Sequence, residues 1–236
     1  MAEERVPTLR DIENVVSALL LAEQFSGDQN GMYIPSACPV ARLGVALEPW
    51  PGIAAWVRDE KLDALWLHRP WKLEPLPAGI GVLAYHYAFD ERLTTGYNPF
   101  LADALGLSGS EVLGDKEGRP LGLIGNVAPL AAAAFEARVE TEFGGLAGRY
   151  GASAATVSRA CVVGALRPEL IREAAARGAQ VYITGEYRAR AQEAVAATRL
   201  RVLEVGHRRS EVWGLRTLAA LLSERFPALN VRLSAG

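Results

Sequence analysis

Three histidines occur in this sequence, and each directly follows an apolar segment that is typical of a buried strand: His68, His86 and His207. In α/β proteins, residues that carry chemistry gather beyond the carboxyl ends of the strands. We therefore expect the three imidazoles to meet at the C-terminal edge of one sheet. A single histidine at such an edge is more often a hydrogen-bonded structural residue, but the agreement among all three favours a shared site.

Two of these histidines are followed by a carboxylate four residues later, Asp90 after His86 and Glu211 after His207. Residues four apart on a helix share one face, so an imidazole and a carboxylate can converge on one cation. Nitrogen and oxygen donors of this kind suit zinc, manganese, iron, cobalt or nickel. The alternative interpretation makes Glu211 a first-turn acid favoured by the helix dipole and Asp90 a solvated surface acid.

A hydrolytic site is the chemistry that this donor set predicts. A divalent cation lowers the pKa of a bound water from 15.7 toward about 7, and a carboxylate such as Glu211, or the imidazole of His86, can then carry the proton. Glu186 follows an apolar segment at 181–184 and is expected beside the site without ligating the metal.

The apolar pattern also predicts the elements that must position these residues. Thr8 and Asp11 form a capping pattern before a first amphipathic helix, and Ser210 is expected as the N-cap of the helix that carries Glu211. Predicted strands cover residues 41–48, 62–67, 80–85, 156–163, 181–184, 200–205 and 230–233. Predicted helices cover residues 51–59, 98–105, 129–143, 168–177, 187–197 and 210–225, with a loop at 27–39, an irregular stretch after residue 86 and a hairpin at 111–127. This alternation predicts α/β architecture with mixed, largely parallel sheets flanked by helices.

The hairpin is expected to separate two lobes of a single unit, about 1–127 and about 128–236, with a crossover of the chain between them allowed. The glycine-rich stretch 143–155 is the segment most similar to a linker.

Composition limits the class of protein. The 236 residues carry 25 Lys plus Arg against 27 Asp plus Glu, a net charge of −2, which does not favour dedicated nucleic-acid binding. The two cysteines, Cys38 and Cys161, do not have the spacing of a disulfide framework or of a zinc knuckle. An acidic N-terminus without an apolar core, together with the absence of long apolar runs, predicts a cytoplasmic protein without a membrane segment.

The motifs resemble those of the Nif-three-like family of dinuclear metal proteins, which is often described as type-two GTP cyclohydrolase. The segment from Leu67 to Pro70 resembles its His-His-Pro motif, and the segment from His86 to Asp90 resembles its His-Thr-Asn-x-Asp motif. Residues 181–186, and then 205–207 with Glu211, resemble its C-terminal half. The resemblance spans nearly the whole chain.

This resemblance implies a set of ligands and an assembly. Metal ligation is implied for His68, Asp90, His207 and Glu211, with Glu211 bridging two ions. His86 would be a further ligand or would contact one of the ligands. It also implies two α/β lobes, a hexameric ring of this chain, and metal-activated water that attacks a nucleotide-type substrate at the purine. In such a reaction, Arg69 or Arg208 would hold the triphosphate, with Glu186 nearby.

The sequence departs from the family at specific positions. Arg69 replaces the second histidine of His-His-Pro, so one or two ions per chain are expected, and Ala88 replaces the asparagine of the second motif. Two other functions remain open. The first is a metal-binding ring that serves as a scaffold or regulator without catalysis, and the second, which the charge favours less, is nucleic-acid binding in the ring cavity.

Overall fold

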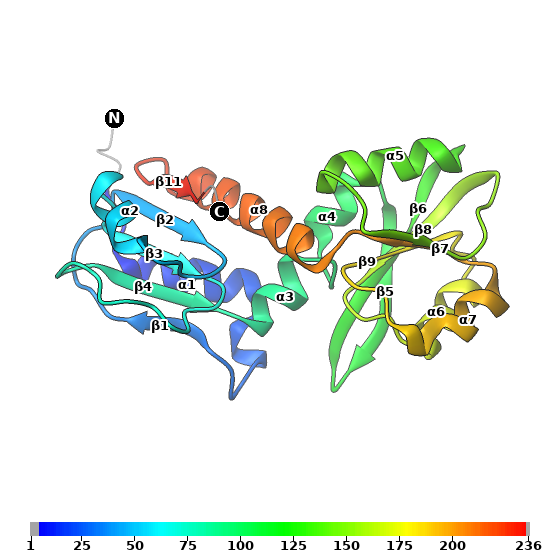
Figure 1. Cartoon of the computed structure of the whole chain (residues 1–236), viewed down its shortest axis with the longest axis horizontal. Helices are drawn as coiled ribbons and strands as arrows, with labels where there is room; N and C mark the ends of the chain where they lie inside the picture. Colours follow the sequence, from blue (N-terminus) through cyan, green and yellow to red (C-terminus); the bar gives the residue numbers. More distant parts are fainter. Residues whose placement is uncertain (1–4, 235–236) are drawn as a thin grey trace. The chain divides into compact units, whose positions relative to one another are not determined.

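The computed structural model describes residues 5–234, which fold as two compact units (Figure 1). Of the described residues, unit 1 comprises 5–89 and 214–234, and unit 2 comprises 90–213. The expected boundary near residue 127 therefore lies inside unit 2, within a strand. The last helix, α8 (His207–Arg225), begins in unit 2 and ends in unit 1, so that the chain returns to the unit where it started.

Unit 1 contains a five-stranded sheet in which the first strand is antiparallel to its neighbour and the other pairs are parallel. The order is β1 (Asn30–Ile34), β4 (Gly81–Tyr85), β3 (Ala64–Leu67), β2 (Arg42–Ala46) and β11 (Asn230–Leu233). Four of these strands were predicted. The prediction of a loop at 27–39 was wrong because β1 is a half-buried edge strand whose ordering depends on pairing with β4, about 50 residues later.

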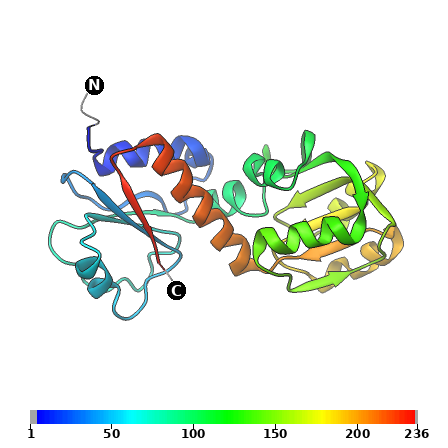
Figure 2. The same cartoon turned by 90° about the horizontal axis from the view of Figure 1, so that it is seen from above.

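Helices cover both faces of the unit 1 sheet (Figure 2). One face, with Leu65 and Leu67, packs against α2 (Ile53–Asp59). The other face carries Trp66 and Tyr85, and the Tyr85 hydroxyl donates to the backbone carbonyl of Glu13 in α1 (Leu9–Leu20) at 3.2 Å. A 3₁₀ turn, η1 (Ala22–Gln24), follows α1. The predicted capping pattern before α1 is confirmed.

Unit 2 contains a mixed six-stranded sheet. Its order is β5 (Ser108–Lys116), β6 (Arg119–Ala131), β8 (Thr156–Val163), β9 (Val181–Thr184), β10 (Arg201–Glu204) and β7 (Gly148–Tyr150). The predicted hairpin is confirmed as β5 and β6, and the bounds of β8 and β9 agree with the prediction. Residues 148–150, expected in a loop, form the edge strand β7, whose partner β10 lies about 50 residues away.

The faces of the unit 2 sheet are covered by α5 (Ala132–Phe143) on one side and by α6 (Pro168–Ala176) and α7 (Gln192–Thr198) on the other (Figure 1). The 3₁₀ turn η2 (Ala189–Ala191) precedes α7. Pro129, expected as the first residue of a helix, lies in β6, and α5 begins three residues later.

Two helices carry predicted site residues: α3 (Tyr87–Leu93), with Asp90, and α8, with His207 and Glu211. The helix α4 (Pro99–Ala104) follows α3 in the chain. The stretch between residue 86 and the helix expected at 98 was predicted to be irregular, but its first part, Tyr87–Leu93, is helical. Ser210 is not an N-cap, because α8 begins at His207 and the Ser210 hydroxyl donates to the His207 carbonyl at 2.7 Å. Among residues 5–234, none of the helices has both the length and the apolar character required to cross a membrane.

The three histidines do not follow strands of one sheet, which corrects the prediction of a single edge. His68 and His86 follow β3 and β4 of the unit 1 sheet, whereas His207 follows β10 of the unit 2 sheet. The error has a physical cause: local patterns identify strand ends, but the assignment of strands to sheets depends on pairing between distant segments.

Candidate metal site

Three predicted ligands lie together in unit 2. Asp90, His207 and Glu211 offer ligand atoms that all lie within 4.8 Å of one another. Nε2 of His207 is 3.0 Å from Oε1 of Glu211, as expected for residues four apart on one helix face. The Glu211 side chain is 2% exposed and that of His207 is 58% exposed. The group therefore combines a buried carboxylate with an imidazole that solvent can reach.

The turn between β10 and α8 sets this geometry. Gly206 has a positive φ of 91°, a conformation that favours glycine, and α8 begins at the next residue. Gly185, which follows β9, lies against the start of α8, where an added Cβ would be 3.3 Å from the Ser210 hydroxyl. Gly206 therefore permits the turn into α8, and Gly185 lets the end of β9 approach α8 closely. Together they hold His207 and Glu211 near the strand ends.

Two predicted site residues lie together in unit 1, His68 and His86, and the centroids of their rings are 5.3 Å apart. His68 is fully buried, and its Nδ1 lies 2.9 Å from the carbonyl oxygen of Tyr85. Since a carbonyl only accepts, Nδ1 carries the proton and donates. In the neutral ring, Nε2 of His68 then has the lone pair that a metal ligand requires.

Asp28 contacts Nδ1 of His86 as the Tyr85 carbonyl contacts Nδ1 of His68. No role was predicted from the sequence for Asp28. Its Oδ1 lies 3.0 Å from Nδ1 of His86, and its Oδ2 accepts the backbone N–H of Tyr87 at 2.6 Å. Partial burial by itself would raise the pKa of Asp28. The hydrogen bonds from Tyr87 and His86, together with the charge of His86 and the backbone N–H of Gln29, outweigh it and lower the pKa below its ordinary value. A hydrogen-bonded carboxylate behind an imidazole fixes its tautomer and orientation.

The three residues predicted to bind substrate have different surroundings. The guanidinium of Arg69 donates to Oε1 of Glu48 at 3.0 Å. Glu186 is exposed and forms an ion pair of 3.2 Å with Arg188. Arg208 lines a hollow of about 520 Å³ together with His207 and other residues of unit 2. The remaining lining residues of this hollow are Phe143, Gly206, Arg209 and Val212. Arg208 thus shares a hollow with the candidate ligand His207.

The donors of unit 2 fit a divalent cation. Two carboxylates and an imidazole are the ligand types that zinc, manganese, iron, cobalt and nickel accept. The buried Glu211 carboxylate lies beside the His207 imidazole, and a cation in contact with Asp90, His207 and Glu211 would add positive charge near it.

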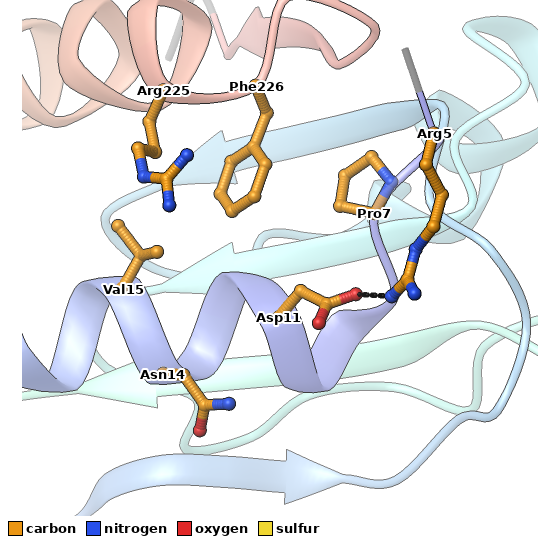
Figure 3. Close-up of a pocket in the computed structure, with 7 residues that line it drawn as sticks. All are labelled: Arg5, Pro7, Asp11, Asn14, Val15, Arg225 and Phe226. Atoms are coloured by element: carbon orange, nitrogen blue, oxygen red, sulfur yellow. Dashed lines mark hydrogen bonds and ion pairs between the residues drawn. The ribbon is translucent and has the colours of Figure 1, made fainter. Parts of the chain in front are cut away.

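A different hollow, in unit 1, has a volume of about 400 Å³ and includes none of the predicted site residues (Figure 3). It lies between α1 and the end of α8 and is lined by Arg5, Pro7, Asp11, Asn14, Val15, Arg225 and Phe226. Arg5 and Asp11 form an ion pair of 2.6 Å at one side of it. Because Asp11 also caps α1, its carboxylate has a structural role here.

Comparison with protein families matches residues 73–235 to Duf34/NIF3 (NGG1p interacting factor 3). Three curated relatives are named GTP cyclohydrolase 1 type 2 homolog. The relative from Deinococcus radiodurans is 28% identical over 64% of this chain and 58% of its own length. The relative from Pyrococcus horikoshii is 30% identical over 67% of this chain and 64% of its own length. The chain thus spans less than two thirds of both relatives. The relative from Allochromatium vinosum is 25% identical over 92% of each chain.

Solved structures agree on the fold. The protein ybgI, described as of unknown function, superposes with a TM-score of 0.74 at 22% identity over 97% of this chain and 98% of that chain. A Bacillus cereus protein related to NIF3 superposes with a TM-score of 0.69 at 15% identity over 98% of each chain. The predicted fold class of two α/β lobes is confirmed.

Proposed function

Because the chain belongs to the Duf34/NIF3 family, we propose that it binds a divalent metal ion and acts as a hydrolase on a nucleotide-type substrate. The observation that carries this proposal is the group formed by Asp90, His207 and Glu211, whose ligand atoms lie within 4.8 Å of one another. The name GTP cyclohydrolase, printed for the relatives, supports the choice of a nucleotide.

The residues divide into ligands and groups that move protons. Asp90, His207 and Glu211 would hold the cation. His68 and His86, whose Nδ1 atoms are held by Tyr85 and Asp28, would direct Nε2 toward a second cation or toward the substrate. A bound divalent cation supplies an acidified water and a Lewis acid. In unit 2, the Glu211 carboxylate would take the proton of the attacking water and return it to the leaving group, and in unit 1 Nε2 of His86 would offer a second base.

The phosphates of the substrate would bind beside His207. Arg208 and Arg209 line the hollow of about 520 Å³ there, at the first turn of α8. Guanidinium groups and helix N-termini both favour phosphate oxygens. In unit 1, Arg69 forms an ion pair with Glu48, which a phosphate bound by that guanidinium would have to displace.

A metal-binding scaffold without turnover is the second candidate, and Arg69 is the observation that favours it. The guanidinium stands at the position where the resembled motif has a histidine, and a guanidinium stays protonated and does not ligate metals. We propose that the group in unit 2 is the tighter metal site and that a second ion binds weakly. In both candidates, the chain would assemble with further copies of itself, as a ring.

Metal content per chain tests the proposal directly. Protein purified without chelator or affinity tag is compared with Glu211→Gln, which keeps the side-chain volume, and with Glu193→Gln, an exposed first-turn acid of α7, as the matched control. We expect at least one ion per chain in wild type and in the control, and loss of that ion in Glu211→Gln. Wild-type protein that stays metal-free after incubation with zinc, manganese or iron would refute the proposal.

Turnover separates the two candidates. Metal-loaded wild type is incubated with GTP, and the release of formate or phosphate is measured beside Glu211→Gln. Product formed by wild type and not by the variant supports the hydrolase. Stable metal binding without product from GTP or other nucleotides supports the scaffold.

A further inference from the structure

Two large aromatic side chains of unit 1 lie exposed against the ring of His86. Trp71 is 49% exposed and Tyr87 is 55% exposed, the two highest fractions among the exposed large hydrophobic side chains of the described residues. Large apolar rings are normally buried, and exposed aromatic groups concentrate at binding sites. Their common contact with one candidate catalytic residue therefore calls for a function beyond core packing.

The three rings form a defined arrangement. The Trp71 ring meets His86 edge-on, with centroids 4.9 Å apart and planes at 83°. The Tyr87 ring lies nearly parallel to His86, with centroids 4.2 Å apart and planes at 29°. Offset-stacked and edge-to-face pairs of this kind are the favourable arrangements of aromatic rings. Together, Trp71, His86 and Tyr87 form an aromatic trio.

The backbone around the aromatic trio is fixed by specific contacts. Asp28 holds both His86 and the backbone N–H of Tyr87. Trp71 lies in a turn in which the N–H of Leu73 donates to the Pro70 carbonyl at 3.2 Å. A ligand that stacks here would meet rings whose backbones are already ordered, so that little entropy is lost on binding.

We propose that Trp71 and Tyr87 form a stacking site for a planar nitrogen heterocycle of the nucleobase class, beside His86. Every nucleobase has a π-face, and stacking on an aromatic side chain contributes about 1–3 kcal/mol per base. Aliphatic or purely anionic ligands gain no such stabilisation. The inference rests on the proposed function in one respect, namely that the stacked heterocycle is the base of the nucleotide-type substrate.

The choice of a small planar ligand over a second copy of this chain follows from the polar surroundings. The aromatic trio includes a titratable imidazole and is backed by the carboxylate of Asp28, with the exposed Lys72 next to Trp71 in the chain. The centres of protein interfaces are depleted in charged groups, whereas ligand sites combine apolar walls with a few polar groups.

Calorimetric titration of the metal-loaded protein tests the proposal with three probes: guanosine, GTP and ribose 5-phosphate, which has no ring system to stack. The variants are Trp71→Leu and Tyr87→Thr. The control is Tyr33→Thr, which removes an aromatic ring of β1 that is 40% exposed. We expect each test variant to bind guanosine and GTP at least about fivefold more weakly, with unchanged affinity for ribose 5-phosphate. The control should bind as wild type does.

Three outcomes would overturn the inference: unchanged affinity for guanosine and GTP in both test variants, absence of nucleoside and nucleotide binding by metal-loaded wild type, or an equal loss of ribose 5-phosphate binding. A change of native mass with unchanged ligand affinity would instead identify the aromatic trio as a contact between copies, which also contradicts the inference. Metal content and GTP turnover are measured on the same preparations. Ring-dependent binding without turnover would refute the hydrolase and leave the stacking site supported.

Discussion

At the scale of single residues, the side chains of His68, His86 and Glu211 each contact a neighbour that orients them. Glu211 is buried beside His207, and the Nδ1 atoms of His68 and His86 contact oxygens of Tyr85 and Asp28. These contacts select the tautomer in which Nε2 has the lone pair, so the imidazoles are ready to ligate or to accept a proton. Removing such a neighbour should change the chemistry more than it changes stability.

Asp28→Asn should lower turnover, or the metal affinity of the site, by roughly 10- to 100-fold, because an amide orients the imidazole of His86 less firmly than a carboxylate does. Metal titration and turnover of GTP check this. The exposed Asp59→Asn, in the same unit, is the control and should behave as wild type. A wild-type value for Asp28→Asn in both measurements would show that Asp28 has no positioning role.

At the scale of elements, caps and glycines decide where helices and strands begin. The start of α1 depends on a reciprocal cap in which Asp11 accepts from the backbone and the hydroxyl of Thr8, while Thr8 accepts from the backbone of Asp11. The hydrogen bonds from the Thr8 backbone and hydroxyl, followed by the one from Arg5, lower the pKa of Asp11 from 3.8 to about 2.

This shift predicts a pH dependence. Since the pKa of Asp11 is lower in the folded state, the cap is fully stabilising above the unfolded value near 3.8 and is lost as the pH falls through about 2. Asp11→Asn should therefore lower Tm by about 2–4 °C at pH 6, and this difference should shrink toward zero as the pH approaches 2. Thermal denaturation by circular dichroism across this range checks it; a difference independent of pH would contradict it.

The edge strand β7 depends on a glycine. Gly151 follows β7 with φ of +74°, and an added Cβ would overlap the carbonyl oxygen of Leu200. Gly118, in the β5–β6 turn, has a similar φ of +82° but open space around it. Gly118→Ala should cost about 1–2 kcal/mol for the left-handed backbone alone. Gly151→Ala should cost more, because β7 must also move. Denaturant unfolding compares the two, and equal losses would contradict the role of the overlap.

At the scale of the whole molecule, the candidate ligands of unit 2 lie where the chain enters and leaves that unit. Asp90 is its first residue, and Glu211 lies two residues before its last. Folding must bring these two residues together across a loop of more than a hundred residues, which costs conformational entropy. A cation held by both would offset that cost, because it binds only when the two residues are close together. Metal binding is thus expected to stabilise unit 2 as a whole.

This linkage predicts that Tm depends on metal concentration. At a free metal concentration about 100 times Kd, the folded state gains about 2.7 kcal/mol, or roughly 5–10 °C in Tm. Addition of a chelator should remove the gain. His207→Ala should show a reduced Tm shift on metal addition, and differential scanning calorimetry with and without metal checks both statements. An equal shift in the variant would place the bound metal elsewhere.

The sequence by itself determined the features that depend on local spacing. The pairing of His207 with Glu211 needs only an α-helix, in which residues four apart share one face. The strands β8 and β9 and the β5–β6 hairpin depend on apolar runs and turn residues. The family was predicted from the motifs around His68 and His86 together with those at 181–186 and 205–211, because each motif is contiguous in the chain.

Only the tertiary structure decided the contacts between segments that are far apart in the chain. Asp28 and His86 are separated by 58 residues, and nothing near Asp28 indicates that a sheet edge will bring them together. The same holds for the edge strands β1 and β7, for the division of the histidines between two sheets, and for the pairing of Arg69 with Glu48. The physical reason is that periodicity records which face of an element is buried, whereas the identity of the neighbour depends on strand pairing and packing across the whole unit.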